Sequence, residues 1–356
     1  MAIASDIERP SARERGRGWL VRVLGRIGSL LVSVALTVFG LLFVTFMIGR
    51  VIPVDPLLAV VGDRASEEIR QRTAAELGLD LPLWRQFLRY LGDILQGDFG
   101  HSVLSGEPVL TDIGRFFPAT LELATAATLI GVCVGVPLGV LAATRHGSWQ
   151  DQVIRVVALI GYSVPVFWLG LVGLLLFYAK LDWVAGPGRI DVAYEYSIEP
   201  LTGLMLVDTL LAHDTDAFFD ALSHLILPAS VLGYFSLAYI TRMTRSLMLA
   251  ELGQEYIIAA RVKGLPERRV VWRHALGNVL VPLITTIALS YAYLLEGAVL
   301  TETVFAWPGL GLYITQSLFS ADLTAVLGAT IVIGLVFIGI NLLSDVLYAL
   351  VDPRAA

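Results

Sequence analysis

Residues 118–143 read PATLELATAATLIGVCVGVPLGVLAA, and Glu122 is the one charged side chain in the stretch. A helix needs about 20 predominantly apolar residues to cross a hydrocarbon core about 30 Å thick. The stretch meets that length, and its glycines and prolines are tolerated in helices that lie in lipid. It therefore predicts a transmembrane helix.

Five further stretches of the same character lie on either side of it. The chain has 356 residues, 56% hydrophobic and 16% charged, against about 45–50% and about 25% in soluble domains. The first stretch exceeds the apolar core of a signal peptide, about 7–15 residues, so we expect it to be retained. The sequence predicts an all-α integral membrane protein with six transmembrane helices, at 27–48, 118–143, 153–179, 225–249, 279–300 and 323–350.

Lysine and arginine are distributed unequally between the segments that connect these spans. Most of them lie in 1–26, 143–155 and 242–277, and none lies in 301–323. Loops rich in Lys and Arg remain on the cytoplasmic side of a membrane. We therefore expect both termini in the cytoplasm. The predicted organisation is a cytoplasmic tail (1–26), a six-span domain (27–350) with outer segments 51–117 and 180–224 and a cytoplasmic loop 250–277, and a cytoplasmic C-terminus (351–356).

The two outer segments differ in character. In the first, 67–77 and 84–95 carry apolar residues at helical spacing, which predicts short amphipathic helices near the membrane surface. Segment 180–224 carries far more acidic than basic residues. Such a charge run is typical of a solvated surface; the alternatives are an electrostatic funnel for a cationic ligand and a docking rim for a partner.

The sequence lacks the motifs of several kinds of catalytic and ligand-binding site. A P-loop needs Lys directly after Gly, but the two lysines, Lys180 and Lys263, follow Ala179 and Val262. The five histidines have no metal-ligand spacing, and Cys133 is the single cysteine. We therefore expect no catalytic site, no metal site and no cofactor bound by this chain, which makes it a non-enzyme.

Segment 256–266 reads YIIAARVKGLP and lies in the longest predicted cytoplasmic loop. It resembles the EAA loop of binding-protein-dependent ABC importers, in the form found in the dipeptide/oligopeptide permease family. Ala259, Ala260 and Gly264 stand at the two alanine positions and the glycine of that motif. Ile258 stands where the general motif has Glu, and Pro282 comes later than the general pattern places it; both departures match the peptide branch.

Other segments extend this resemblance over about residues 20–354. Residues 1–20 have no counterpart in it, and we expect them to form a disordered tail. The matching segments are LGLDLPL at 77–83, QGDFG at 96–100, PLTGLMLVDT at 200–209, ALSHLILPA at 221–229, LTETVFAWPGLG at 300–311 and NLLSDVLYALVDPR at 341–354.

The resemblance implies an ABC type I importer permease core with structured periplasmic segments, in a bacterial inner membrane. It implies a second homologous six-span subunit, two cytoplasmic ATPase subunits that bind ATP and Mg, and a periplasmic or lipid-anchored substrate-binding protein. The cargo implied is short peptides. The alternatives are another cargo (an opine, nickel chelate, glutathione, haem or oligosaccharide) and an ion-coupled transporter, which has no need of an EAA-like loop.

The resemblance also nominates site residues. By this resemblance, residues 256–264 form the helix that docks on the ATPase. Small residues there allow close approach of the partner, and Gly264 lets the chain turn out of the helix. The alternative is an ordinary basic loop. The residues assigned to this coupling loop are Tyr256, Ala259, Ala260, Arg261, Lys263 and Gly264.

Polar side chains within or near the spans are the second set of candidates. Such residues mark substrate paths in membrane proteins, and the alternative is anchoring or packing against a partner subunit. Arg242 and Arg245 are predicted to anchor the end of their span. The candidates for a translocation path are Glu122, Glu296, Asn341 and Asp345.

Overall fold

The computed structural model describes residues 12–51, 66–76 and 78–351, and most of the residues within these ranges are helical. The one β-bridge in them is isolated, between His101 and Pro108. Five helices are long and apolar enough to cross a membrane, or six if one bent pair counts as a single span. The predicted all-α membrane fold is confirmed. The chain divides into two units, Met1–Ile52 and Pro53–Ala356.

The first unit contains one long helix, α1 (Ala12–Val51), whose apolar part is Gly28–Arg50. The expectation of a disordered tail over 1–20 is wrong for 12–20, which form the first turns of α1. After Pro10 this part of the chain has no proline and is rich in arginine, which favours helix. Residues 1–11 lie outside the described residues.

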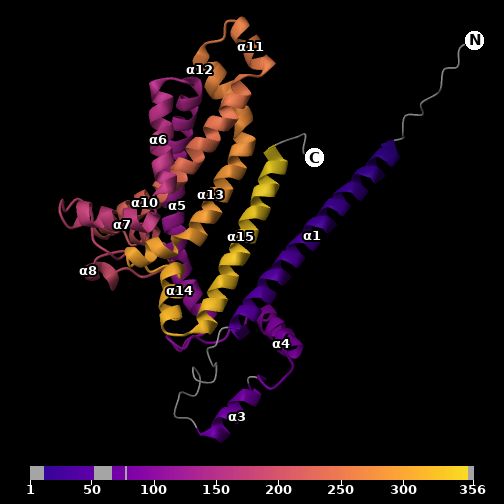
Figure 1. Cartoon of the computed structure of the whole chain (residues 1–356), viewed down its shortest axis with the longest axis vertical. Helices are drawn as coiled ribbons and strands as arrows, with labels where there is room; N and C mark the ends of the chain where they lie inside the picture. Colours follow the sequence, from indigo (N-terminus) through magenta and orange to yellow (C-terminus); the bar gives the residue numbers. More distant parts are fainter. Residues whose placement is uncertain (1–11, 52–65, 77, 352–356) are drawn as a thin grey trace, which may run out of the picture. The chain divides into compact units, whose positions relative to one another are not determined.

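The core of the second unit is formed by α5 (Val109–Thr144), α10 (Thr215–Leu252), α13 (Leu276–Val304) and α15 (Leu323–Val351). These helices run side by side in Figure 1. At one end of them lie α11 (Glu255–Val262) and α12 (Glu267–Arg269), followed by the π-helical turn η2 (Val270–Ala275). At the other end lies α14 (Leu310–Phe319), between α13 and α15.

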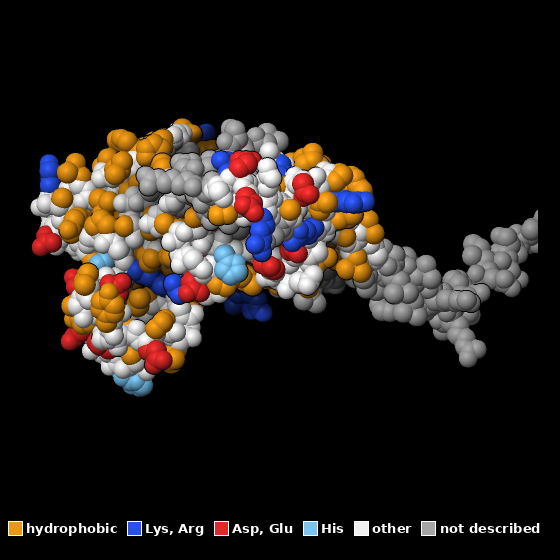
Figure 2. Space-filling model, turned by 90° about the horizontal axis from the view of Figure 1, so that it is seen from below, with side chains coloured by type: hydrophobic (Ala, Val, Ile, Leu, Met, Phe, Trp, Pro, Cys, Tyr) orange, Lys and Arg blue, Asp and Glu red, His pale blue; other side chains and the backbone are white. Residues whose placement is uncertain are grey.

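The predicted short helices of the outer segments are present. They are α3 (Glu67–Glu76) and α4 (Leu83–Leu95), each within one residue of the predicted bounds. The acidic segment contains α8 (Val192–Glu195) and α9 (Met205–Leu211). Figure 2, seen from the α14 end, shows acidic side chains dispersed over this face among basic and hydrophobic ones, not gathered in one patch. The interpretation of segment 180–224 as a solvated surface stays a prediction.

The third predicted span is not one continuous helix. It consists of α6 (Trp149–Ser163), α7 (Val166–Gly173) and the π-helical turn η1 (Leu174–Tyr178), with a bend of 98° at the break before α7. The break has a local cause. Pro165 has no N–H and disfavours helical dihedrals in the preceding residue, and Val164 is extended, with ψ 132°. Prediction from apolar length alone missed this bend.

Helices α5 and α10 approach each other closely along a row of glycines. Gly131, Gly135 and Gly139 face Ser236, Thr241 and Thr244 of α10 respectively, and a Cβ on Gly139 would lie 2.6 Å from the Cβ of Thr244. Small residues spaced by four allow membrane helices to pack backbone to backbone. The apolar core that surrounds this contact contains Leu123 and Ala127 of α5, Leu232 of α10, and Leu294 and Ala298 of α13.

Candidate coupling surface and buried polar sites

The predicted coupling loop forms the short helix α11, and its end depends on a glycine. The Gly264 N–H donates to the Arg261 carbonyl (2.9 Å) and the Leu265 N–H to the Ala260 carbonyl (3.3 Å), the hydrogen bonds of a Schellman motif. Gly264 has φ +77°, and no atom lies within 4 Å of the place a Cβ would take. Backbone conformation, not space, therefore requires glycine here.

One face of α11 packs on the chain itself. Ile257 and Ala260 are buried in an apolar cluster with Val270 and Val271 of η2 and Met248 of α10. The structure thus separates the two alanines of the motif. Ala260 is small because it lies against this cluster, whereas Ala259 is exposed.

The other face of α11 is apolar and uncovered in this chain. Ile258 and Val262, one helical turn apart, are 53% and 82% exposed, and Ala259 lies beside them. Four exposed cations lie on α11 or just after it, namely Arg261, Lys263, Arg268 and Arg269, and Arg261 forms an ion pair with Glu267 (2.8 Å). An apolar patch with a polar rim is typical of a protein interaction site, and the positive rim would suit an acidic partner.

Tyr256 connects α11 to two core helices. Its hydroxyl donates to the Glu251 carboxylate of α10, and the Asn278 amide of α13 donates to the Tyr256 oxygen (2.8 Å) and to Glu251 (3.2 Å). Burial and the hydrogen bond to Glu251 raise the pKa of Tyr256 to about 12. These hydrogen bonds join α11 to α10 and α13 at one point.

Glu122, a candidate for the translocation path, is engaged in contacts with the acidic outer segment. Arg189 donates to its carboxylate through Nε (2.9 Å) and Nη2 (2.5 Å), and the Leu206 N–H donates to the other carboxylate oxygen (2.8 Å). Arg189 also donates to the Gly203 carbonyl (2.8 Å) and lies over the Trp307 ring. Both charges are buried. These contacts favour the anchoring interpretation of Glu122.

Among the described side chains, neither Glu296 nor Asn341 joins this network. Glu296 is exposed on α13 and Asn341 is half-buried on α15. Asp345 belongs to α15, but its side chain lies outside the described residues. Their assignment to a translocation path stays a prediction.

The two arginines near the end of α10 differ in their partners. Arg245 forms an ion pair with Asp151 of α6, with distances of 2.6 and 2.8 Å. Arg242 is exposed and lies over the rings of Tyr162 and Tyr239, at 5.1 and 5.8 Å from their centroids. In the described part of the chain no group of three or more His, Cys, Asp or Glu side chains could hold a metal ion.

Sequence reasoning missed a buried carboxylate at the α14 end. Glu302 accepts hydrogen bonds from the Thr120 hydroxyl (2.7 Å) and from the N–H groups of Gly311 (2.6 Å) and Leu312 (3.1 Å), so it caps the start of α14. A Cβ on Gly309 would lie 2.5 Å from its carboxyl group. The available signal was a glutamate seven residues before a glycine-rich turn in the segment 300–311.

Comparisons with known proteins cover nearly the whole chain. A family model described as "Binding-protein-dependent transport system inner membrane component" matches residues 135–356, and the model of the N-terminal part of such membrane components matches residues 21–124.

Curated relatives and solved structures agree with the family models. A probable D,D-dipeptide transport system permease protein of Escherichia coli (strain K12) is 44% identical over 90% of this chain and 94% of its own length. A di/tripeptide transport system permease protein of Pseudomonas aeruginosa (strain UCBPP-PA14) is 44% identical over 89% and 94%. A chain of the MetNI methionine ABC transporter, in an inward-facing conformation, has a TM-score of 0.52 at 18% identity and covers 68% of this chain and 96% of that one, which shows the fold alone.

Proposed function

This chain belongs to the family of binding-protein-dependent transport system inner membrane components, and from that premise we propose that it is the membrane permease subunit of an ATP-driven importer of short peptides. The observation that carries the proposal is the 44% identity, over about nine tenths of the chain, to permease proteins whose names specify dipeptides or di/tripeptides. The chain is a multi-pass protein of the inner membrane.

The chain works with other subunits, an ATPase and a substrate-binding protein among them. In our proposal it pairs with a second six-span permease chain, and two ATPase subunits bind ATP and Mg below it. The membrane helices adopt two conformations, one open to each side of the membrane. ATP shifts the equilibrium between these conformations because the transporter binds ATP more tightly in one of them than in the other. The chain itself binds no nucleotide, in keeping with the lack of a P-loop in its sequence.

The exposed face of α11 is the proposed contact with the ATPase. Ile258, Ala259 and Val262 offer an apolar surface with a positive rim, and Ile257 and Ala260 join the same helix to the core. Because α11 is packed on the core, a movement of α11 would be transmitted directly to α10 and α13. The Lys/Arg distribution supports placing α11 and both termini in the cytoplasm.

Peptide uptake tests the function directly. In a strain without redundant peptide importers, deletion of the gene for this chain is expected to abolish uptake of a radiolabelled dipeptide, and a plasmid copy is expected to restore it. The purified chain alone should show no ATP hydrolysis. Unchanged uptake in the deletion strain would exclude the peptide cargo, and ATP-independent transport by the purified chain in vesicles would exclude the importer mechanism.

The contact between Tyr256, Glu251 and Asn278 predicts a coupling defect. Tyr256→Phe removes the hydroxyl that joins α11 to α10 and α13, and one hydrogen bond contributes about 1 kcal/mol. We expect a fall of about fivefold in peptide transported per ATP hydrolysed, with ATP hydrolysis largely retained, measured in proteoliposomes of the assembled transporter. Tyr196→Phe, at a 90% exposed outer tyrosine, is the control. An unchanged transport-to-hydrolysis ratio in Tyr256→Phe would contradict this role.

A further inference from the structure

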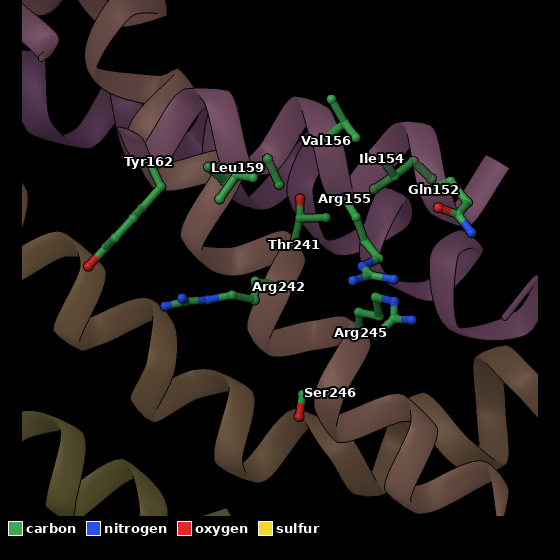
Figure 3. Close-up of a pocket in the computed structure, with 12 residues that line it drawn as sticks. Gln152, Ile154, Arg155, Val156, Leu159, Tyr162, Thr241, Arg242, Arg245 and Ser246 are labelled. Carbon is green, nitrogen blue, oxygen red and sulfur yellow. The ribbon is translucent and has the colours of Figure 1, made fainter. Parts of the chain in front are cut away.

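A half-open cavity lies between α6 and α10, away from the coupling surface. Its volume is about 460 Å³, and both helices contribute polar and apolar side chains to its lining. In Figure 3 the side chains of Arg155 on α6 and Arg245 on α10 extend into the space between the two helices, and Thr241 and Ser246 border it from α10.

The cavity carries excess positive charge. Its lining contains Arg155, Arg242 and Arg245 but no acidic residue. Asp151 neutralises Arg245 through two hydrogen bonds, and within the described ranges neither Arg155 nor Arg242 forms an ion pair. Arg155 interacts electrostatically with Asp151 without a hydrogen bond to it, so three arginines and one carboxylate leave net positive charge at the cavity, and Arg242 is held over two tyrosine rings.

Apolar side chains continue from the mouth of the cavity along α6. Val156 and Leu159 line it and are 55% and 64% exposed, and Val153 and Ile160 beside them are 49% and 48% exposed. A site for a free inorganic anion needs no such surface. Cationic groups next to an uncovered apolar strip suit a molecule that is anionic at one end and aliphatic at the other.

The cavity lies toward the end of α10 that leads to α11. Helix α10 has 38 residues, and at about 1.5 Å per residue it exceeds a hydrocarbon core of about 30 Å. Arg242 is ten residues before the last residue, Leu252, which places it about 13 Å from the middle of the helix. Arg242 therefore lies in the half of α10 that leads to the Lys/Arg-rich loop 250–277.

We infer that this cavity binds the headgroup of an anionic phospholipid between Arg155 and Arg242, whose side chains extend in different directions in Figure 3, with Val156 and Leu159 contacting the acyl chain. Basic pockets between membrane helices on the cytoplasmic side bind headgroups in this way. The choice of the cytoplasmic leaflet depends on the orientation proposed above, whereas the headgroup chemistry does not. A bound lipid would fill the groove between α6 and α10 and hold the two helices together.

Binding of fluorescent phosphatidylglycerol to the assembled transporter, purified in detergent without ATP or cargo, tests this inference separately from transport. Arg155→Gln/Arg242→Gln is expected to weaken binding about fivefold for each arginine replaced. Arg145→Gln, at an exposed arginine in the loop before α6 that does not line the cavity, should bind as the wild type does. The single variant Arg242→Gln serves if the double variant is unstable, and thermal melting establishes that each variant is folded.

Competition identifies the ligand. Unlabelled phosphatidylglycerol should displace the probe, whereas phosphatidylcholine, inorganic phosphate and dialanine at the same concentration should not. Displacement by dialanine would overturn the inference in favour of a cargo contact. Equal displacement by phosphatidylcholine or phosphate, or unaltered binding by the folded arginine variants, would also overturn it.

Discussion

Replacing Gly264 with valine is expected to abolish peptide transport while the protein remains in the membrane. The residue has φ +77°, a region in which a β-branched side chain is a steric outlier, at a cost of about 1–3 kcal/mol. The strain would open the Schellman motif that ends α11 and turn the helix, with its exposed apolar face, away from its partner. Uptake of labelled dipeptide and the amount of the variant in the membrane fraction measure the two parts of this prediction.

A second glycine supplies a matched control. Gly253 ends α10 at φ −84°, and the nearest atom to a Cβ there, the Ala250 carbonyl oxygen, is 3.7 Å away. Gly264→Ala is expected to lose most transport, whereas Gly253→Ala keeps it, because only the first substitution forces an L side chain into the left-handed region. Normal uptake by Gly264→Val would show that the end of α11 does not matter for coupling.

Removal of Arg189 is expected to cause the largest loss of stability. The Arg189–Glu122 pair is 10% and 7% exposed, and breaking a buried ion pair costs about 3–5 kcal/mol because an uncompensated charge stays buried. Arg189→Met should therefore lower the melting temperature of the detergent-solubilised chain. It should also release the outer segment 180–224 to limited proteolysis, since Arg189 holds both Glu122 and the Gly203 carbonyl.

The double variant separates charge from packing. Glu122→Gln/Arg189→Met leaves no buried charge at the position of this ion pair, and the glutamine carbonyl can still accept from the Leu206 N–H. We therefore expect the double variant to recover much of the stability that Arg189→Met loses. Arg85→Met, at an exposed arginine of α4, should melt as the wild type does. An Arg189→Met variant with wild-type melting and proteolysis would mean that the pair does not anchor this segment.

The existence and bounds of α11 were largely predictable from sequence. Its position in the longest basic loop, its length and its end at Gly264 agree with α11 as found. The faces of the helix were not predictable, because Ala259 and Ala260 are identical side chains. Only the cluster formed by Val270, Val271 and Met248 decides that Ala260 is buried and Ala259 exposed.

The buried polar sites were much less predictable. Glu122 was identified as a charge in an apolar span, but its partner Arg189 is 67 residues away in a segment that reads as a solvated loop. Glu302 lies in a recognised segment, yet its role depends on how α14 turns back over it. Such pairs form through contacts between distant parts of the chain, and local patterns do not encode their geometry.

The amino-acid sequence by itself determined that this is a multi-span membrane protein with the motifs of a permease family, because apolar length and the residues of a motif are local properties of the chain. Tertiary structure decided which charges are paired, which face of α11 is uncovered and that three arginines line a cavity between α6 and α10. A charge in lipid is stabilised only by the particular group that meets it, and the packing of distant helices selects that group.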